Sequence, residues 1–322
     1  MISYVIRKVL FSLVVLVFAS IFIFGLVSLA GDPLVELKQN PRIRAEDIQR
    51  ISAIYGLDRS YPEQYLFWIK GVLQGDLGTS FKQNAPVNEI IGQRIFPTVL
   101  LMGTSILITM IFAIPFGIYS AIRKYSWLDN LGTFFAFLGF SMPIFWLALI
   151  LQLVFGVYLT EWAGTRVFYT SGISDTNSGG GLVDLIKHLT LPALSLAIIQ
   201  SAVYSRFQRS AMLDVLSSDY LRTARAKGLS RRTVYLKHAL RNALIPTVTL
   251  LALYMGTILG GAIITETVFA WPGLGFLFAD ALFKGDFNVA RGILLLIAVL
   301  VVFFNLVADL VYAFVDPRIS YD

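Results

Sequence analysis

Six long apolar segments run through this sequence and limit the folds that it can adopt. A helix that crosses a bilayer needs about 20 mainly apolar residues. The segments that meet or approach this length are residues 9–30, 99–122, 131–159, 189–204, 244–270 and 293–315. Glu266 and Asp309 are the only acidic or basic residues in them. We therefore predict an all-α integral membrane protein with six transmembrane helices.

Composition supports a membrane location. The 322 residues are 57% hydrophobic and 14% charged, whereas soluble domains are roughly 45–50% apolar and about 25% charged. Segment 189–204 is the weakest of the six, because it is short and contains Pro192. In a membrane, neighbouring helices can satisfy the backbone groups that a proline leaves free. We therefore expect Pro115, Pro143, Pro192 and Pro246 to kink helices.

The sequence offers little for catalysis. It has no cysteine and two histidines, His188 and His238, which excludes thiolate sites and disfavours a metal cage. A phosphate-binding P-loop needs the spacing Gly-x4-Gly-Lys-Ser/Thr, and the nearest look-alike, residues 75–82, lacks it. We predict no catalytic residue, no metal ligand and no cofactor bound by this chain.

Basic residues predict the orientation, because cytoplasmic loops carry the excess of Lys and Arg. With the N-terminus inside, the inner segments contain fourteen basic residues and the two short outer loops contain four. Both termini are therefore expected in the cytoplasm. The expected parts are the first span within 1–30, an outer segment 31–97, a five-helix core 98–315 and a cytoplasmic tail 316–322.

The first apolar segment has an alternative interpretation. Ser28-Leu29-Ala30 resembles the cleavage site of a signal peptide. The apolar part of a signal peptide is about 7–15 residues long, whereas this run spans residues 9–30. The length favours an uncleaved anchor, and N-terminal sequencing that found a start at Gly31 would overturn it.

The outer segment is predicted to be folded. Residues 44–54 and 61–73 have the apolar spacing of short amphipathic helices, and residues 75–78 have the composition of a turn. We expect a small helical segment that packs on the outer face of the bundle.

The net charge of +6 is concentrated in one place. Residues 206–241 contain nine Lys or Arg and two Asp, an excess larger than that of the whole chain. Within this stretch, Ser218 is suited to cap a short helix, Gly228 to end it in a left-handed conformation, and Ser230 to cap a second short helix toward Leu240.

The small residues Ala224, Ala226 and Gly228 are expected on the exposed turn, where another protein can approach closely. Flanking arginines offer forked donors to carboxylates. We interpret loop 205–243 as a docking site for a partner protein. The alternative is that these residues are ordinary positive-inside charges that lie against anionic lipid. Nucleic acid is excluded as a partner.

This loop resembles the cytoplasmic EAA loop of bacterial ABC importer permeases, in the variant of dipeptide, oligopeptide and nickel systems. The resemblance rests on the runs 219–229 and 238–246, with 75–78, 94–98 and 266–275 as further matches. Arg222-Thr223-Ala224 stands where Glu-Ala-Ala would be, so the acidic residue of the general pattern is replaced. The long outer segment resembles that of the B-type subunit.

The resemblance implies a type-I ABC importer permease fold in the bacterial cytoplasmic membrane. It implies a heterodimeric pathway with a C-type permease subunit, two ATPase subunits that use ATP and Mg, and an outer substrate-binding protein. Di- or oligopeptides are the expected substrates, with nickel complexes or glutathione as alternatives. The residues expected to couple to the ATPases are Asp219, Tyr220, Arg222, Thr223, Ala224, Arg225, Ala226, Lys227, Gly228 and Leu229.

Other residues are candidates for the pathway or for packing. Glu266 is expected as a satisfied carboxylate or an outer-gate element together with Trp271, Pro272 and Gly273, and a rigid loop plug is the simpler interpretation of that turn. Asp309 is expected to make a structural hydrogen bond. Gly256 and Gly260 have the spacing for close helix packing.

A different class of function also has to be considered. An ion-coupled secondary transporter should show proton or sodium ligands at mid-membrane and usually an internal repeat. A membrane enzyme should show a clustered nucleophile or metal set. Neither pattern is visible in the sequence.

Overall fold

The computed structural model describes residues 2–32, 34–39, 43–54, 56–175 and 180–315, with the backbone alone at 2–4, 36–37, 252–253, 255–261 and 310–315. The expected tail, 316–322, lies outside them. The described chain is helical, apart from turns and one isolated bridge between Thr79 and Pro86. Five described helices are long and apolar enough to cross a membrane, within residues 5–29, 87–122, 144–163, 182–216 and 287–309.

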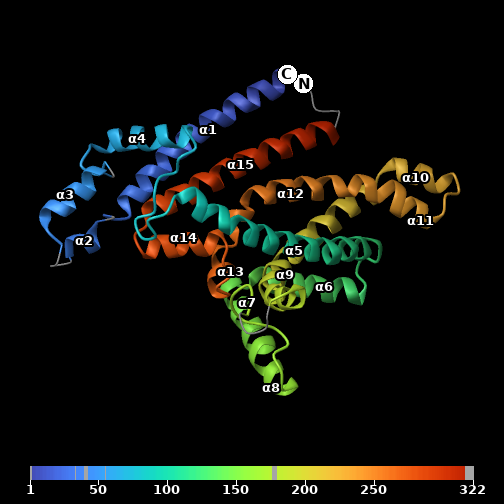
Figure 1. Ribbon diagram of the computed structural model, residues 1–322. Helices are drawn as coiled ribbons and strands as arrows, with labels where there is room; N and C mark the ends of the chain where they lie inside the picture. Colours follow the sequence, from blue (N-terminus) through green and yellow to red (C-terminus); the bar gives the residue numbers. More distant parts are fainter. Residues whose placement is uncertain (1, 33, 40–42, 55, 176–179, 316–322) are drawn as a thin grey trace.

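The first helix, α1 (Ile2–Leu29), packs along the last, α15 (Phe287–Val315) (Figure 1). Between α1 and the next long helix lie α2 (Val35–Gln39), α3 (Ala45–Ile54) and α4 (Tyr61–Leu73). The two amphipathic helices predicted here are confirmed as α3 and α4, and α4 lies against α1.

Two predicted spans are longer than expected. Helix α5 (Val87–Ile122) continues through Pro97, and α9 (Leu182–Leu216) continues through Pro192. The two helices pack together at the centre of the bundle. The two ends of α9 contain polar and charged residues that fall outside an apolar window, which is why the predicted span 189–204 was too short.

The third predicted span, 131–159, is not one helix. It divides into α6 (Trp127–Ser141) and α7 (Ile144–Leu151), which runs on through a π-helical segment, η1 (Gln152–Tyr158), into α8 (Leu159–Ala163). Met142 adopts an extended conformation before Pro143, because a proline disfavours the helical conformation of the residue before it. The expected kink is therefore a break, after which α7 and α8 take a different direction from α6 (Figure 1).

The segment after α9 contains α10 (Asp219–Ala226), α11 (Arg231–Thr233) and the π-helical segment η2 (Val234–Ala239). These lie at the opposite end of the bundle from α2, α3 and α4 (Figure 1). Two further helices, α12 (Leu240–Gly261) and α13 (Ile263–Val268), follow.

The predicted segment 244–270 is thus divided at Ala262 between α12 and α13. The segment after α13 contains a helix that the sequence did not predict, α14 (Leu274–Phe283). This helix packs with α5 and α15 in a buried cluster that contains Val87, Leu277 and Ile293.

Candidate functional site

The basic inner corner is anchored to the bundle by apolar side chains. Leu221 of α10 is fully buried in a cluster with Val234 of η2, Met212 of α9 and Ala121 of α5. Ala224 is buried in the same cluster, so the expectation that it lies on the exposed turn is wrong. Its position one turn after Leu221 places both side chains on the inward face of α10.

The turn between α10 and α11 has the predicted conformation. Gly228 has φ +79°, a left-handed conformation that is costly for a residue with a side chain. Its N–H donates to the carbonyl of Arg225 at 3.0 Å, and the N–H of Leu229 donates to that of Ala224 at 3.4 Å. Ser230 caps α11, because its hydroxyl accepts the N–H of Thr233.

Two details of this corner differ from the prediction. The hydroxyl of Ser218 donates back to the carbonyl of Val215 instead of capping α10. The second helix is not short, because α11, η2 and α12 follow one another with helical dihedral angles. Gly228 is therefore a corner between one short helix and one long helix that enters the bundle.

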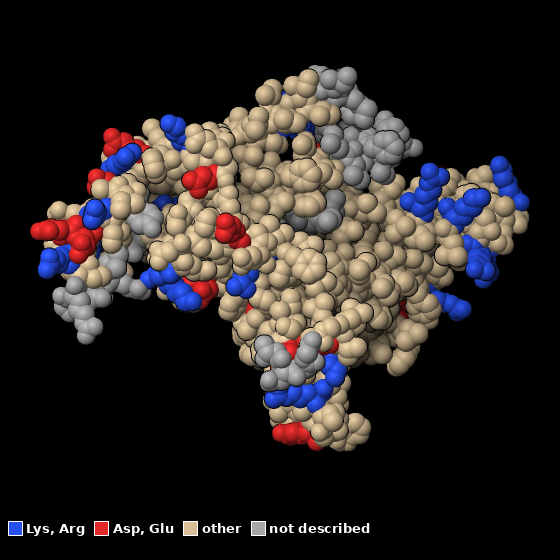
Figure 2. Space-filling model, viewed as in Figure 1, with Lys and Arg blue, Asp and Glu red and all other residues tan. Residues whose placement is uncertain are grey.

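Most of the expected coupling residues form one exposed surface, which we call the basic corner. Its exposed members are Asp219, Tyr220, Arg222, Thr223, Arg225, Ala226, Lys227, Gly228 and Leu229. The side chains of Arg222 and Asp219 are 75% and 94% exposed and form an ion pair at 3.3 Å. Figure 2 shows basic side chains gathered at this end of the molecule. An exposed ion pair of this kind contributes little stability, so Arg222 stays accessible to a partner.

Tyr220 fixes α10 relative to the long helix. Its hydroxyl accepts a hydrogen bond from Asn242 Nδ2 at 2.7 Å. Asn242 lies in the first turn of α12, so this bond connects the two sides of the Gly228 corner.

A buried ion pair next to the basic corner was missed in the sequence. Asp129 of α6 is almost fully buried and accepts hydrogen bonds from Arg209 Nε at 2.9 Å and Arg209 Nη2 at 3.0 Å. Ser120 of α5 and the backbone N–H of Tyr125 also donate to it. The pair joins α5, α6 and α9 at the inner end. Asp129 lies outside the apolar segments, so a search for charges within spans could not find it.

We expect acid to weaken this junction. Burial alone would raise the pKa of Asp129, but the hydrogen bonds from Arg209, Ser120 and Tyr125 lower it to about 2. A lowered pKa stabilises the fold above the unfolded value, about 3.9, and this stabilisation is lost as the pH falls toward 2. Asp129→Asn should remove about 2 kcal/mol at pH 7, measured as thermal unfolding of the purified complex in detergent. If the variant and the wild type lose the same stability between pH 5 and 3, the acid sensitivity does not arise from Asp129.

Glu266 in α13 is a fully buried and well-satisfied carboxylate. It accepts hydrogen bonds from Thr98 Oγ1 at 2.8 Å and from the backbone N–H groups of Gly275 and Phe276 at 2.7 and 3.0 Å. Gly275 and Phe276 begin α14, so the carboxylate lies at the positive end of that helix. The satisfied carboxylate expected from the sequence is therefore present.

The turn from Trp271 to Gly273 packs closely on the same group. The Trp271 ring is fully buried, and its Nε1 donates to the carbonyl of Pro97 at 2.9 Å. A Cβ at Gly273 would meet the Glu266 carboxylate at 2.3 Å, so only glycine fits there. Arg94 donates to the carbonyl of Pro272 at 3.3 Å. Thr98 links Glu266 to the start of α14, because its hydroxyl also accepts the N–H of Leu274. No sequence pattern indicates this link.

The remaining candidates lie elsewhere. Asp309 forms an ion pair with Lys8 at 2.7 Å, which agrees with the expected structural role and joins α15 to α1. Gly256 and Gly260 lie in the part of α12 where the structure describes the backbone alone, so their packing lies outside the described residues.

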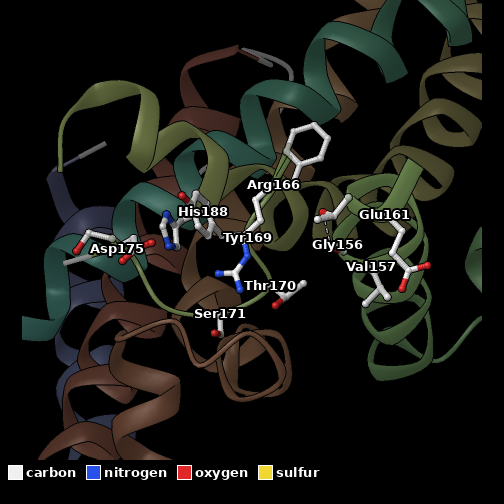
Figure 3. Close-up of a pocket in the computed structure, with 12 residues that line it drawn as sticks. Gly156, Val157, Glu161, Arg166, Tyr169, Thr170, Ser171, Asp175 and His188 are labelled. Atoms are coloured by element: carbon white, nitrogen blue, oxygen red, sulfur yellow. Dashed lines mark hydrogen bonds between the residues drawn. The ribbon is translucent and has the colours of Figure 1, made fainter. Parts of the chain in front are cut away.

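A cavity of about 680 Å³ lies between η1, α8 and the start of α9. In Figure 3 the Arg166 side chain points into it, while Tyr169 and His188 lie at one side. The rings of Tyr169 and His188 are stacked with centroids 4.1 Å apart. Gln152 links the loop that lines the cavity to the end of α13, because its Nε2 donates to the carbonyls of both Thr170 and Val268.

The fold and this site define a class of protein: a multi-pass helical membrane subunit with an exposed basic corner anchored on the bundle and a closely packed turn, residues 271–273, away from it. Comparison with protein families identifies the family. Residues 113–321 match the family described as binding-protein-dependent transport system inner membrane component, and residues 1–103 match the N-terminal family of such membrane components. The chain belongs to this family of inner-membrane transport subunits.

Characterised relatives cover most or all of the chain. It is 43% identical to the oligopeptide transport system permease protein AppB of Bacillus subtilis, across the full length of both. It is 40% identical to the dipeptide transport system permease protein DppB of Escherichia coli K12, over 90% of each chain. It is 38% identical to the glutathione transport system permease protein GsiC of Salmonella typhimurium, again over both full lengths.

Membership of the family has direct consequences for this chain. It is a permease subunit in the inner membrane and not itself an enzyme, because the ATP is used by partner ATPase subunits. A substrate-binding protein is the other partner of such a system. The prediction of an ATP-driven, binding-protein-dependent importer subunit is thereby confirmed.

Proposed function

We propose that this chain forms one half of a heterodimeric pathway for di- or oligopeptides, together with a C-type permease subunit. The names of AppB and DppB, at 43% and 40% identity, support peptides as the substrate class. Glutathione, itself a small peptide, is the substrate named for GsiC, and nickel complexes are a further alternative. The cognate binding protein can be purified and its retained ligand identified by mass spectrometry. A metal chelate without peptide would overturn the peptide assignment.

The observation that carries the coupling role is the basic corner. Its solvent-facing side is exposed, while the buried side chains of Leu221 and Val234 anchor it on the bundle. A partner that binds Arg222, Arg225 and Lys227 can therefore move the bundle and not merely a loose loop. We infer that ATPase subunits bind the basic corner and that their closure drives the change between inward-open and outward-open states.

The arrangement in the membrane belongs to the same proposal. We infer that α12, with 22 residues, is the sixth span, although part of its side chains lies outside the described residues. Both termini and the basic corner are then cytoplasmic, and α2, α3 and α4 form the outer segment. The fourteen basic residues of the inner segments, against four in the short outer loops, support this orientation.

Purification tests the function directly. The tagged chain should co-purify with a second permease subunit and two ATPases, and the complex should take up peptide in proteoliposomes only with ATP and the binding protein. The matched control is the same complex without the ATPases, which should give no uptake. Peptide uptake by this chain alone, driven by an ion gradient, would replace the proposal with an ion-coupled secondary transporter.

A further inference from the structure

A second cavity lies at the end of the bundle that carries α4. It has a volume of about 510 Å³ and lies between α4, α1 and the first turns of α15. Its charged lining residues are Lys70, Arg291 and Asp76, two basic against one acidic. The proposed transport function assigns no role to this cavity.

Arg291 is a buried cation that has no counter-ion among the residues described by the structure. The residue is 7% exposed, and its guanidinium carbon lies 4.5 Å from the centroid of the Phe24 ring. Nη2 donates to Ser28 Oγ at 3.0 Å, whereas Nε has no hydrogen-bond partner, and Arg291 forms no ion pair within the described part of the chain. Because a buried charge is costly unless it is paired, this position favours an anion from outside the chain.

A second buried donor lines the same cavity. Trp68 is 8% exposed, and its indole Nε1 has no hydrogen-bond partner. Buried indole N–H groups usually find an acceptor. Trp68 and Arg291 both line the cavity, and each carries a donor without a partner among the described residues. Neither nitrogen has accessible surface of its own, so an acceptor bound in the cavity would reach them through a small shift of these side chains.

An apolar groove begins where this cavity ends. It has a volume of about 450 Å³ and lies between α1 and α4. Phe24 lines both spaces, and Ser28 lines the groove while it accepts the hydrogen bond from Arg291. A polar space with a cation thus continues into an apolar one, which fits a molecule with an anionic group and a hydrocarbon chain.

The depth of the site agrees with the level of lipid headgroups. Ser28 lies in the last turn of the α1 span, and Arg291 lies near the start of the α15 span. Tyr61, Tyr65 and Trp68 of α4 lie beside them, and such aromatic residues are enriched at the boundary between membrane and water. Ile21 and Leu29 of α1 line the groove and are exposed apolar side chains, so the groove borders on lipid.

We propose that the cavity and groove together bind one anionic phospholipid of the adjacent leaflet. The phosphate accepts hydrogen bonds from Arg291 and Trp68, and one acyl chain lies in the groove beside Phe24. The lipid fills the space between α1, α4 and α15 and supplies a counter-ion that the described part of the chain does not provide.

Native mass spectrometry of the full transporter complex tests this assignment. Phosphatidylglycerol should remain bound to the wild type, and Arg291→Gln should weaken its apparent affinity about tenfold, the factor that corresponds to about 1.4 kcal/mol. Arg59→Gln is the matched control, because Arg59 also lies over an aromatic ring, Phe67, but is exposed. It should bind lipid as the wild type does. Arg291→Lys keeps the charge and should bind with intermediate affinity.

The same measurement with other ligands distinguishes the possible sources of the anion. Phosphatidylcholine and inorganic phosphate should neither replace phosphatidylglycerol nor bind in an Arg291-dependent way. Arg291-dependent binding of inorganic phosphate alone would overturn the lipid assignment. Equal retention of phosphatidylglycerol by the wild type and Arg291→Gln would overturn the site itself. Should Arg291→Gln fail to assemble, loss of lipid from Trp68→Phe, which keeps the ring but removes the donor, decides the question in the same way.

Discussion

Gly228→Val should lower ATP-driven uptake by the reconstituted complex at least about tenfold, equivalent to about 1.4 kcal/mol. A side chain at φ +79° is strained, so the corner either changes its angle or presents a bulky group where the partner approaches. A Cβ at this position meets no atom within 4 Å, so the loss would not come from a clash inside the subunit. Peptide uptake and peptide-stimulated ATP hydrolysis are the measurements.

Gly285→Val is the matched control for this experiment. Gly285 follows α14 as Gly228 follows α10, with φ +69°, no atom within 4 Å of a Cβ, and the same pair of terminal hydrogen bonds. Both variants carry the same backbone strain, about 1–2 kcal/mol, at opposite ends of the bundle. Equal uptake by the two variants would show that the Gly228 corner has no special part in coupling.

Glu266→Ala should cause the largest loss of stability. It leaves the Thr98 hydroxyl and two backbone N–H groups, of Gly275 and Phe276, without their buried acceptor. Each such loss costs about 1–3 kcal/mol, so we expect at least about 3 kcal/mol and a Tm lower by about 5 °C or more. Thermal unfolding of the purified complex in detergent measures both.

The control for Glu266 is Glu89→Ala, the same change at an exposed position of α5, which should alter the Tm little. Glu266→Gln retains one carbonyl oxygen as acceptor and should fall between wild type and Glu266→Ala. If instead Glu266→Ala unfolds like the wild type while peptide uptake changes, the carboxylate acts in an outer gate and not as a structural acceptor.

The sequence was informative where local rules decide the structure. Gly228 takes the predicted left-handed conformation, and Ser230 caps α11 as predicted, because these features depend on a few neighbouring residues. The outer helices α3 and α4 followed from their apolar spacing in the same way. The family was identified from the runs around Gly228 and Pro246, and the comparisons confirm it.

Prediction failed where distant residues decide. Ala224 is buried because Met212 and Ala121 come from other helices to meet it. Arg209 and Asp129 are 80 residues apart, and Thr98 and Glu266 are 168 apart, so neither contact has a local sequence pattern. Pro97 and Pro192 lie inside helices whereas Pro143 interrupts one, and this difference depends on packing that no short window contains.

The length of α9 bears on how the two faces of the membrane communicate. Its 35 residues span about 52 Å at about 1.5 Å per residue. His188, near the start of α9, lines the cavity between η1 and α8, and Leu216, the last residue of α9, lies just before α10. When a helix of this length tilts about a point near its middle, its two ends move in opposite directions. If the ATPases act at the basic corner as proposed, closure at one face and opening at the other would be a single movement of this helix.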